Sequence, residues 1–231
     1  MRPGDIVTHA EMCAEEGGML QRGMTFRAPP NVGVILMSQR PNAPYQDAAD
    51  GDGNVLYEGH DAPRSRENPE PKQIDQPRYL PSGKPTENGK FADWTDRFRE
   101  GSVPPAVFHV YEKVRDGIWT FRGPYALRAY HYVGVGKRKV FRFQLAPIVE
   151  HSRILASAGE ADNDEAIRRI PTFVKQAVYK RDKGRCVLCG STSELHFDHE
   201  LPFSKGGTGL SADNVRILCA RCNLSKGARI E

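Results

Sequence analysis

The sequence lacks any long hydrophobic segment. No apolar run approaches the roughly 18 residues that a membrane-spanning helix needs. The first residues, MRPGDIVTHAEMCAEEGG, contain no apolar core of the kind found in signal peptides. We therefore expect a cytoplasmic protein that does not enter a membrane.

Strong net charge and internal repeats are also absent. The hydrophobic fraction of 39% and the charged fraction of 27% are typical of a globular protein with a real core. The net charge is only +4, but residues 165–231 hold 12 of the 33 Lys and Arg residues and only 7 of the 29 Asp and Glu residues. This excess positive charge would suit a polyanion such as DNA, although a solvated basic surface explains it equally well.

Cysteine is scarce, and its placement is informative. Of five cysteines, Cys13 stands alone and has the character of a small buried residue, while the other four form two Cys-x-x-Cys pairs. In a cytoplasmic protein such pairs indicate metal binding rather than disulfides. Two pairs complete a tetrahedral site, so we expect a structural Zn²⁺ bound by Cys186, Cys189, Cys219 and Cys222.

The first 150 residues have mainly the pattern of β-strands. The segments VGVILMS, AVFHVYEKV, GIWTFRGPYAL and KVFRFQLAPI are rich in β-branched and aromatic residues, and Asp116-Gly117 predicts a hairpin between the second and third. Residues 61–95 are Pro-rich and charged, which predicts a long loop.

A helical pattern begins after this region. Pro171 suits the first turn of a helix and Gly184 suits its end. We therefore divide the chain into a first domain over residues 1–150, a linker or helix over 151–170, and a second domain over 171–231.

Polar residues of a particular kind lie between the two cysteine pairs. ELHFDHELPF and VRIL are strand-like, SKGGTGLSADN is loop-like, and ARCNLSKGAR is helical, which gives a ββα order. Asp198 and His199 belong to the first strand, Asn214 precedes the second strand, and Asn223 lies in the helix. A purely structural zinc ribbon would need none of these four side chains.

This arrangement resembles the HNH endonucleases of the McrA-like type, over about residues 185–229. The resemblance implies that His199 is the general base and that Asp198 and Asn223 bind a catalytic divalent metal, Mg²⁺ or Mn²⁺. Asn214 would hold the loop or orient His199. Asn223 stands where the family often has its final His.

Three further residues of this segment have less specific interpretations. His196 is expected to be a packed histidine without a catalytic role. Lys205 and Lys226 are candidate phosphate contacts, although solvated lysines are equally ordinary.

A second motif lies in PYQDAADGDGNVLYEGHD, residues 44–61. Two tyrosines, Tyr45 and Tyr57, flank an acidic turn, and Gly59 follows shortly after. Without further context this is a strand, a turn and a strand with ordinary tyrosines.

Ahead of an HNH unit, the same stretch resembles the SRA (YDG) domains of the PUA-like superfamily, over roughly residues 3–148. The resemblance implies a pocket for a flipped modified cytosine, formed by Tyr45, Tyr57 and Gly59. The acid that contacts the base would be Asp47 or Glu58, because the family's usual acid position holds Ala48 here.

Together these observations predict an α+β protein, with an N-terminal SRA/PUA-like twisted β-barrel and a C-terminal zinc-stapled ββα-metal HNH domain. The expected function is a modification-dependent, 5-methylcytosine-type DNA restriction endonuclease that binds double-stranded DNA containing modified cytosine. Since one HNH unit cuts one strand, we expect a homodimer. A non-cleaving reader of modified DNA, or an HNH endonuclease without modification preference, are the alternatives.

Overall fold

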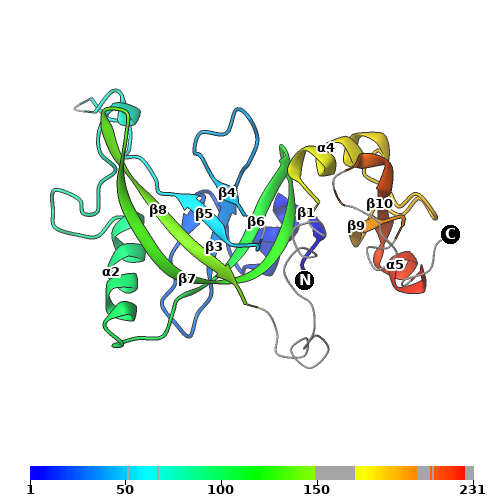
Figure 1. Cartoon of the computed structure of the whole chain (residues 1–231), viewed down its shortest axis with the longest axis horizontal. Coiled ribbons are helices and arrows are strands. Elements are labelled where there is room, and N and C mark those ends of the chain that lie inside the picture. Colours follow the sequence, from blue (N-terminus) through cyan, green and yellow to red (C-terminus); the bar gives the residue numbers. More distant parts are fainter. Residues whose placement is uncertain (51, 67, 149–169, 202–208, 210, 227–231) are drawn as a thin grey trace.

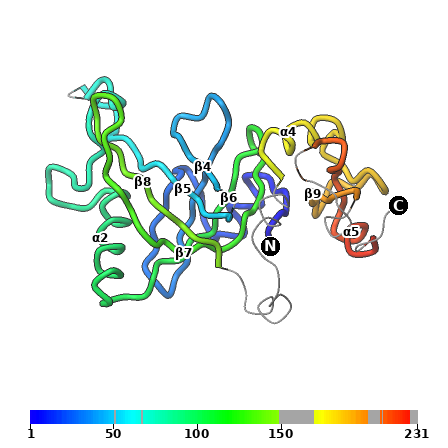
Figure 2. Tube along the Cα trace, viewed as in Figure 1, coloured from blue at the N-terminus to red at the C-terminus, as the bar shows by residue number. Residues whose placement is uncertain are grey.

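The computed structural model describes residues 1–50, 52–66, 68–148, 170–201, 209 and 211–226. The predicted linker over 151–170 falls outside these residues except for its last position. Figures 1 and 2 show the course of the chain. The strands and helices, in chain order, are β1 (Asp5–Thr8), α1 (His9–Glu15), β2 (Met24–Thr25), β3 (Gly33–Met37), β4 (Ala48–Ala49), β5 (Val55–Glu58), η1 (Pro71–Gln73), α2 (Glu87–Arg99), β6 (Val107–Arg115), β7 (Ile118–Val135), β8 (Arg138–Pro147), α4 (Thr172–Arg181), β9 (Leu195–His199), η4 (Ala212–Asn214), β10 (Val215–Cys219) and α5 (Ala220–Lys226).

All ten strands belong to one mixed sheet. Its main path runs β10-β9-β1-β7-β6-β3-β2, and a branch continues from β7 through β8 and β5 to β4. Only the pairing of β3 with β6 is parallel among these strands. The mixed sheet with helices packed against it confirms the predicted α+β class.

The long strand β7 is the centre of this arrangement. Its first half pairs with β1 and β6, and its second half pairs with β8. Register shifts interrupt both long ladders, between Val110 and Tyr111 on β6 and between Leu127 and Ala129 on β7. Because an extra residue bends and twists a strand, these shifts let β7 curve and change partner along its length (Figure 1).

Helix α2 packs over the main hydrophobic core. Phe91 of α2 stacks on Phe108 with ring centroids 4.5 Å apart, and both side chains are fully buried. The prediction of a loop as far as Thr95 was wrong, because α2 begins at Glu87. The Thr86 side chain caps it by accepting a hydrogen bond from the Gly89 amide.

The C-terminal unit has the predicted ββα order. Strands β9 and β10 form an antiparallel pair, α5 follows β10 directly, and α4 packs beside them. Helix α4 begins after Pro171, and Gly184 adopts a positive φ of 62° beyond its end. The hydrophobic core of this unit also includes Ile6, which comes from β1 at the other end of the chain.

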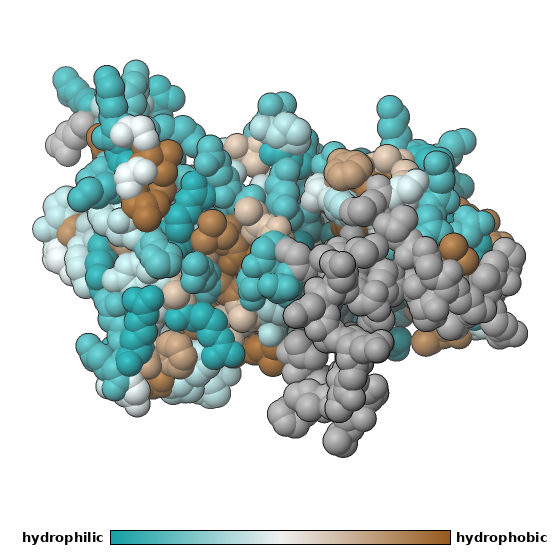
Figure 3. Space-filling view, in the orientation of Figure 1, coloured by the Kyte–Doolittle hydropathy of each residue, from teal (hydrophilic) through white to brown (hydrophobic). Residues whose placement is uncertain are grey.

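The coloured part of the face shown in Figure 3 is mainly polar. In the orientation of Figure 3, hydrophobic side chains form small separate groups among hydrophilic ones. Among the described residues, no helix combines the length and the apolar character that crossing a membrane requires.

Candidate functional site

The four paired cysteines converge at one point of the C-terminal unit. Their Sγ atoms all lie within 4.8 Å of one another. Since Zn–S bonds of about 2.3 Å in a tetrahedron place sulfurs about 3.8 Å apart, the cluster fits a Zn²⁺ ion. Burial opposes ionisation of Cys186, but backbone amides of Cys219, Cys189 and Leu188 outweigh it and lower the pKa of this thiol to about 6. Thiolate is the form that binds zinc.

Asp198 and His199 are the last two residues of β9, whose first residue, Leu195, pairs with Cys219. The ammonium group of Lys226, on α5, donates a hydrogen bond of 2.6 Å to Asp198 Oδ2 and another to the His199 carbonyl. Arg216 faces Asp198 across the β9–β10 ladder, with its Nε 3.7 Å from the same oxygen. The Asp198 carboxylate therefore lies among cationic groups at the end of a strand.

His199 has a ring nitrogen available for chemistry. Its Nε2 is buried and has no hydrogen-bond partner among the residues that the structure describes. Burial lowers the pKa of His199 and Lys226 lowers it further, while Asp198 acts in the opposite direction. The imidazole is thus held neutral near pH 7, the state in which it can accept a proton.

Asn214 anchors the chain just beyond β9. Its side-chain Oδ1 accepts a hydrogen bond of 2.8 Å from the Leu201 amide, and its Nδ2 donates one of 3.3 Å to the Leu201 carbonyl. The Asn214 carbonyl accepts from the Glu200 amide at 2.9 Å. Of the two roles predicted for Asn214, holding the loop is the one that these contacts suit.

Asn223 and Lys226 lie three residues apart on α5. Residues at this spacing share one helix face, and Lys226 contacts Asp198 from that face. Asn223 is partly buried on the same side, one turn earlier. Lys226 itself is almost fully buried, so this lysine is a partner of Asp198 rather than the surface phosphate contact that the sequence suggested. Lys205 lies outside the described residues.

A cavity of about 620 Å³ lies in the N-terminal part. Its wall combines aromatic rings, cationic side chains and small polar groups. The lining residues are His9, Leu20, Gln21, Arg22, Gly23, Leu36, Ser38, Arg40, Asn42, Ala43, Pro44, Tyr45, Tyr57, His60, Lys113 and Trp119.

The two predicted tyrosines meet in this cavity around His60. The Tyr45 and His60 rings are stacked, with centroids 5.3 Å apart and planes 17° apart. The Tyr57 hydroxyl lies 3.0 Å from His60 Nε2. Burial lowers the pKa of His60 to about 4, so the ring is neutral near pH 7. Because Tyr45 and His60 are in direct contact, a base would not enter between their rings, and the Lys72 ammonium lies 5.0 Å from the centre of the Tyr45 ring.

Asp47 and Glu58 do not line the cavity, although both lie next to it. Asp47 accepts hydrogen bonds from the Ser38 and Glu58 amides, at 2.9 and 3.1 Å. Burial raises the pKa of Asp47 to about 6 in spite of these two donors. Glu58 is occupied on both oxygens, by the Gln46 amide and by Arg138 and Arg142.

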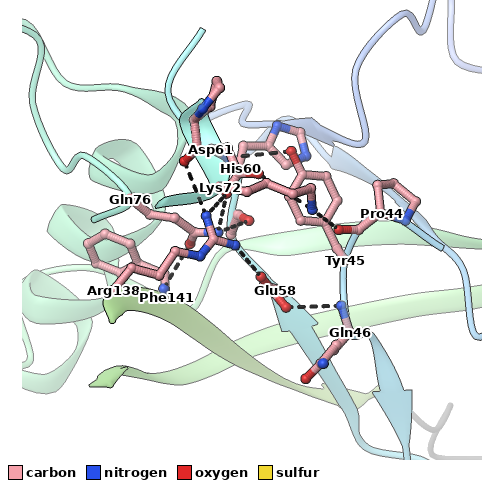
Figure 4. A network of polar contacts seen from close by, with 12 residues as sticks. Pro44, Tyr45, Gln46, Glu58, His60, Asp61, Lys72, Gln76, Arg138 and Phe141 are labelled. Carbon is pink, nitrogen blue, oxygen red and sulfur yellow. Dashed lines mark hydrogen bonds and ion pairs between the residues drawn. The ribbon is translucent and has the colours of Figure 1, made fainter. Parts of the chain in front are cut away.

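A polar network supports the segment that carries these residues (Figure 4). Arg138 joins Asp61, at 2.5 Å, to Glu58, at 3.3 Å. Gly59 leaves no room for a side chain, since a Cβ there would lie 2.6 Å from Asn88 Oδ1 and 2.7 Å from Gln76 Oε1. The Asn88 amide group in turn bonds both the backbone N–H and the carbonyl of His60.

Two residues of this region were not predicted. His60 belongs to the YEGHD stretch that indicated the pocket, and its imidazole was the one available signal. Arg138 lies on β8, far along the chain, and the sequence offers no signal that pairs it with Asp61. His196, by contrast, is buried and lies 3.0 Å from Asp5, as expected for a packed histidine.

Comparison with known families gives a match in the C-terminal part of the chain. Residues 186–229 match the HNH endonuclease family, which confirms the HNH unit predicted for this segment. The family implies a divalent metal at its catalytic centre. A sequence comparison with curated proteins finds no match.

Three solved structures illustrate the likenesses in fold. The SRA domain of SUVH5 in complex with hemimethylated CG DNA is 18% identical, covering 64% of this chain and 89% of that one, with a TM-score of 0.44. The modification-dependent restriction endonuclease TagI is 18% identical, covering 96% and 76%, with a TM-score of 0.42. The type IV phosphorothioation-dependent restriction endonuclease ScoMcrA is 19% identical, covering 98% and 56%, with a TM-score of 0.40.

Proposed function

We propose that the protein is a DNA endonuclease that binds a flipped modified base in the N-terminal cavity and hydrolyses a phosphodiester at the HNH unit. The observation that carries the hydrolytic part is the His199 ring nitrogen, which is buried and unpartnered among the described residues. It stands next to the Asp198 carboxylate within a segment that matches the HNH endonucleases.

His199 removes the proton from the attacking water through this nitrogen. Asp198 and Asn223 offer the carboxylate and amide oxygens that a hard cation prefers, so we propose Mg²⁺ or Mn²⁺ at this position. When bound, such an ion polarises the phosphate and stabilises the departing oxygen. Asn214 holds the chain after β9 through Leu201, which fixes the end of the strand that carries His199. Zn²⁺ at the four cysteines is structural.

The cavity suits a nucleobase because cationic side chains as well as aromatic rings line it. Arg22, Arg40 and Lys113 line it together with Tyr45 and supply cations for the neighbouring phosphates. The aromatic surface of Tyr45 replaces part of the stacking that a flipped base loses. We propose a 5-methylcytosine-type base as the ligand.

Asp47 is the better candidate of the two predicted acids for contacting the base. It bonds the amide of Ser38, which lines the cavity, and each of its oxygens has a second lone pair. Glu58 is tied to two arginines and a backbone amide outside the lining.

One experiment tests this function. Plasmids with and without 5-methylcytosine are incubated with the full chain and Mg²⁺ or Mn²⁺, beside the His199→Ala and Tyr45→Ala variants. His131→Ala is the matched control, because His131 is exposed on β7 and is not among the residues that line the cavity. We expect cutting of the methylated plasmid alone, lost in His199→Ala and retained in the control.

The remaining outcomes distinguish the alternatives. Equal cutting of both plasmids would indicate an HNH endonuclease without modification preference. Binding of methylated DNA without cutting would indicate a reader, and cutting by His199→Ala would remove the assigned base. Double-strand cleavage needs two HNH units or two successive cuts by one unit, and we propose a homodimer on DNA, which sedimentation of the complex would test.

A further inference from the structure

We propose that β1 and Glu112 join the base cavity and the nuclease centre into one rigid unit, so that the DNA strand is cut at a fixed distance from the bound base. The length of the segment over residues 149–169 would then have no influence on the cut position. This inference rests on the proposed function and adds a geometric rule to it.

Strand β1 is the first connection. One edge of β1 pairs with β7, where Val7 faces Trp119 of the cavity wall. The other edge pairs with β9, where Asp5 faces His196, two residues before Asp198. A single strand, about 4.8 Å from each neighbour, therefore separates the cavity wall from the strand that carries the catalytic residues.

Side chains strengthen this pairing. Asp5 Oδ1 lies 3.0 Å from His196 Nδ1, and His196 is buried. Ile6 packs in the same core cluster as Val174 and Leu195 of the C-terminal unit. Directly after β1, His9 lines the cavity. The N-terminal segment thus contacts both the cavity wall and the strand that carries Asp198 and His199.

Glu112 is the second connection. It lies on β6 next to Lys113 of the cavity wall, with its side chain only 1% exposed. Its Oε2 accepts hydrogen bonds of 2.9 Å from Lys175 of α4 and from Arg122 of β7. Its Oε1 bonds the Thr172 hydroxyl of α4.

The same carboxylate reaches the other side of the cavity. Gln39 donates a hydrogen bond of 3.2 Å to Glu112 Oε1, and its two neighbours Ser38 and Arg40 both line the cavity. One buried carboxylate therefore connects two segments of the cavity wall to the helix that packs against β10.

A third contact lies beyond Glu112 on the same strand. The Arg115 guanidinium lies 4.9 Å from the centre of the Tyr179 ring on α4. The β1–β9 ladder alone, with two paired positions, would leave the C-terminal unit free to rotate about β1. Contacts from β6 to α4 at separate points prevent that rotation.

Cut-site mapping tests the inference. A Gly-Ser insertion after Gly159 lengthens the connecting segment, and cleavage of a duplex with one modified cytosine is mapped to the nucleotide. We expect the inserted and unaltered chains to cut at the same position. The Glu112→Gln change on the inserted chain should spread the cuts over several positions, whereas Glu100→Gln, at an exposed glutamate, should not. A shift or spread of cuts from the insertion alone would overturn the inference.

A second measurement does not depend on activity. A protease site is placed after Gly159, the chain is cleaved there, and the two pieces are passed over a size-exclusion column under native conditions. Co-elution, lost in Glu112→Lys, would support the rigid unit, and separation of the unaltered pieces would overturn it. If no DNA is cut, the proposed function fails. The size-exclusion result alone then decides whether the two parts form one rigid unit.

Discussion

The Lys226 ammonium lies 2.6 Å from the Asp198 carboxylate, and the two side chains are 1% and 15% exposed. Such a pair is held away from most solvent, so removal of one partner leaves the other charge uncompensated. The same lysine bonds the His199 carbonyl and so fixes the end of β9. Lys226 therefore positions Asp198 and His199, two of the residues to which the HNH resemblance assigns a role.

The change Lys226→Met should weaken both stability and cleavage. We expect the free energy of unfolding to fall by about 3–5 kcal/mol, as for other broken buried ion pairs. Single-turnover cleavage should slow by about 10- to 100-fold, because Asp198 and His199 lose their alignment. Urea denaturation and a gel-based cleavage assay measure the two effects. Lys137→Met, at an exposed lysine between β7 and β8, is the control. Equal free energies of unfolding for the two variants would disprove the role of Lys226.

Removal of the proposed Zn²⁺ ion should unfold the HNH unit. The four cysteines join the turn after α4 to the end of β10 and to α5, and the core of this unit is small. We expect one zinc per chain by elemental analysis. A chelator, or Cys219→Ser, should lower the melting temperature and abolish cleavage, and Mg²⁺ should not restore either. Cys13→Ser is the control, because Cys13 does not belong to the four-cysteine cluster and its replacement should leave the zinc bound.

The change Gly59→Ala should disturb the base cavity. A Cβ at this position would meet Asn88 Oδ1 at 2.6 Å, Gln76 Oε1 at 2.7 Å and Phe141 Cβ at 2.9 Å. We expect a loss of about 1–3 kcal/mol in the free energy of unfolding, because the crowded groups must shift. Binding of methylated DNA should weaken as well, since Asn88 holds the backbone of His60. Gly134→Ala, which meets open space on β7, should leave both quantities nearly unchanged.

Local spacing explains which features could be predicted. The two Cys-x-x-Cys pairs flank a strand–loop–strand pattern, so the residues that come together here are close in the sequence. The ββα unit and the sulfur cluster can therefore be predicted from short stretches of sequence. The Asp116-Gly117 turn likewise joins β6 and β7. Strand β1 is different, because its partner β9 lies at the other end of the chain and no pattern in either segment identifies the other.

The cavity likewise depends on contacts between distant segments that no sequence pattern identifies. Tyr45, Tyr57 and Gly59 were identified by resemblance, but the ring that stacks on Tyr45 belongs to His60. That position is determined by Asn88, which lies in the first turn of α2. The sequence did not reveal this helix, since its few buried apolar positions follow a Pro-rich stretch with loop character.

His60 should make stability depend on pH. Burial holds the pKa of its ring at about 4, below the ordinary value of 6.5, while Glu87 and Asp61 oppose the shift. Between these values the folded chain binds fewer protons at His60 than the unfolded chain. The contribution of His60 is therefore complete above pH 6.5 and is lost as the pH falls towards 4. Asp47 has the opposite effect on the pH dependence of stability. Burial raises its pKa to about 6, so the folded state gains stability as the pH falls and the carboxylate takes up a proton.

Because these two contributions partly cancel in the unaltered chain, the prediction concerns the difference between it and His60→Gln. Glutamine can still bond the Tyr57 hydroxyl but does not titrate. We expect the stability advantage of the unaltered chain over His60→Gln to shrink by about 1–2 kcal/mol between pH 7 and pH 5. Urea denaturation at both pH values gives this difference, and His131→Gln, at an exposed histidine, provides the matched comparison. An advantage that stays constant over this range would show that the His60 ring is not held neutral by burial, and below pH 6.5 a base stacked beside Tyr45 would then meet a mostly charged imidazole.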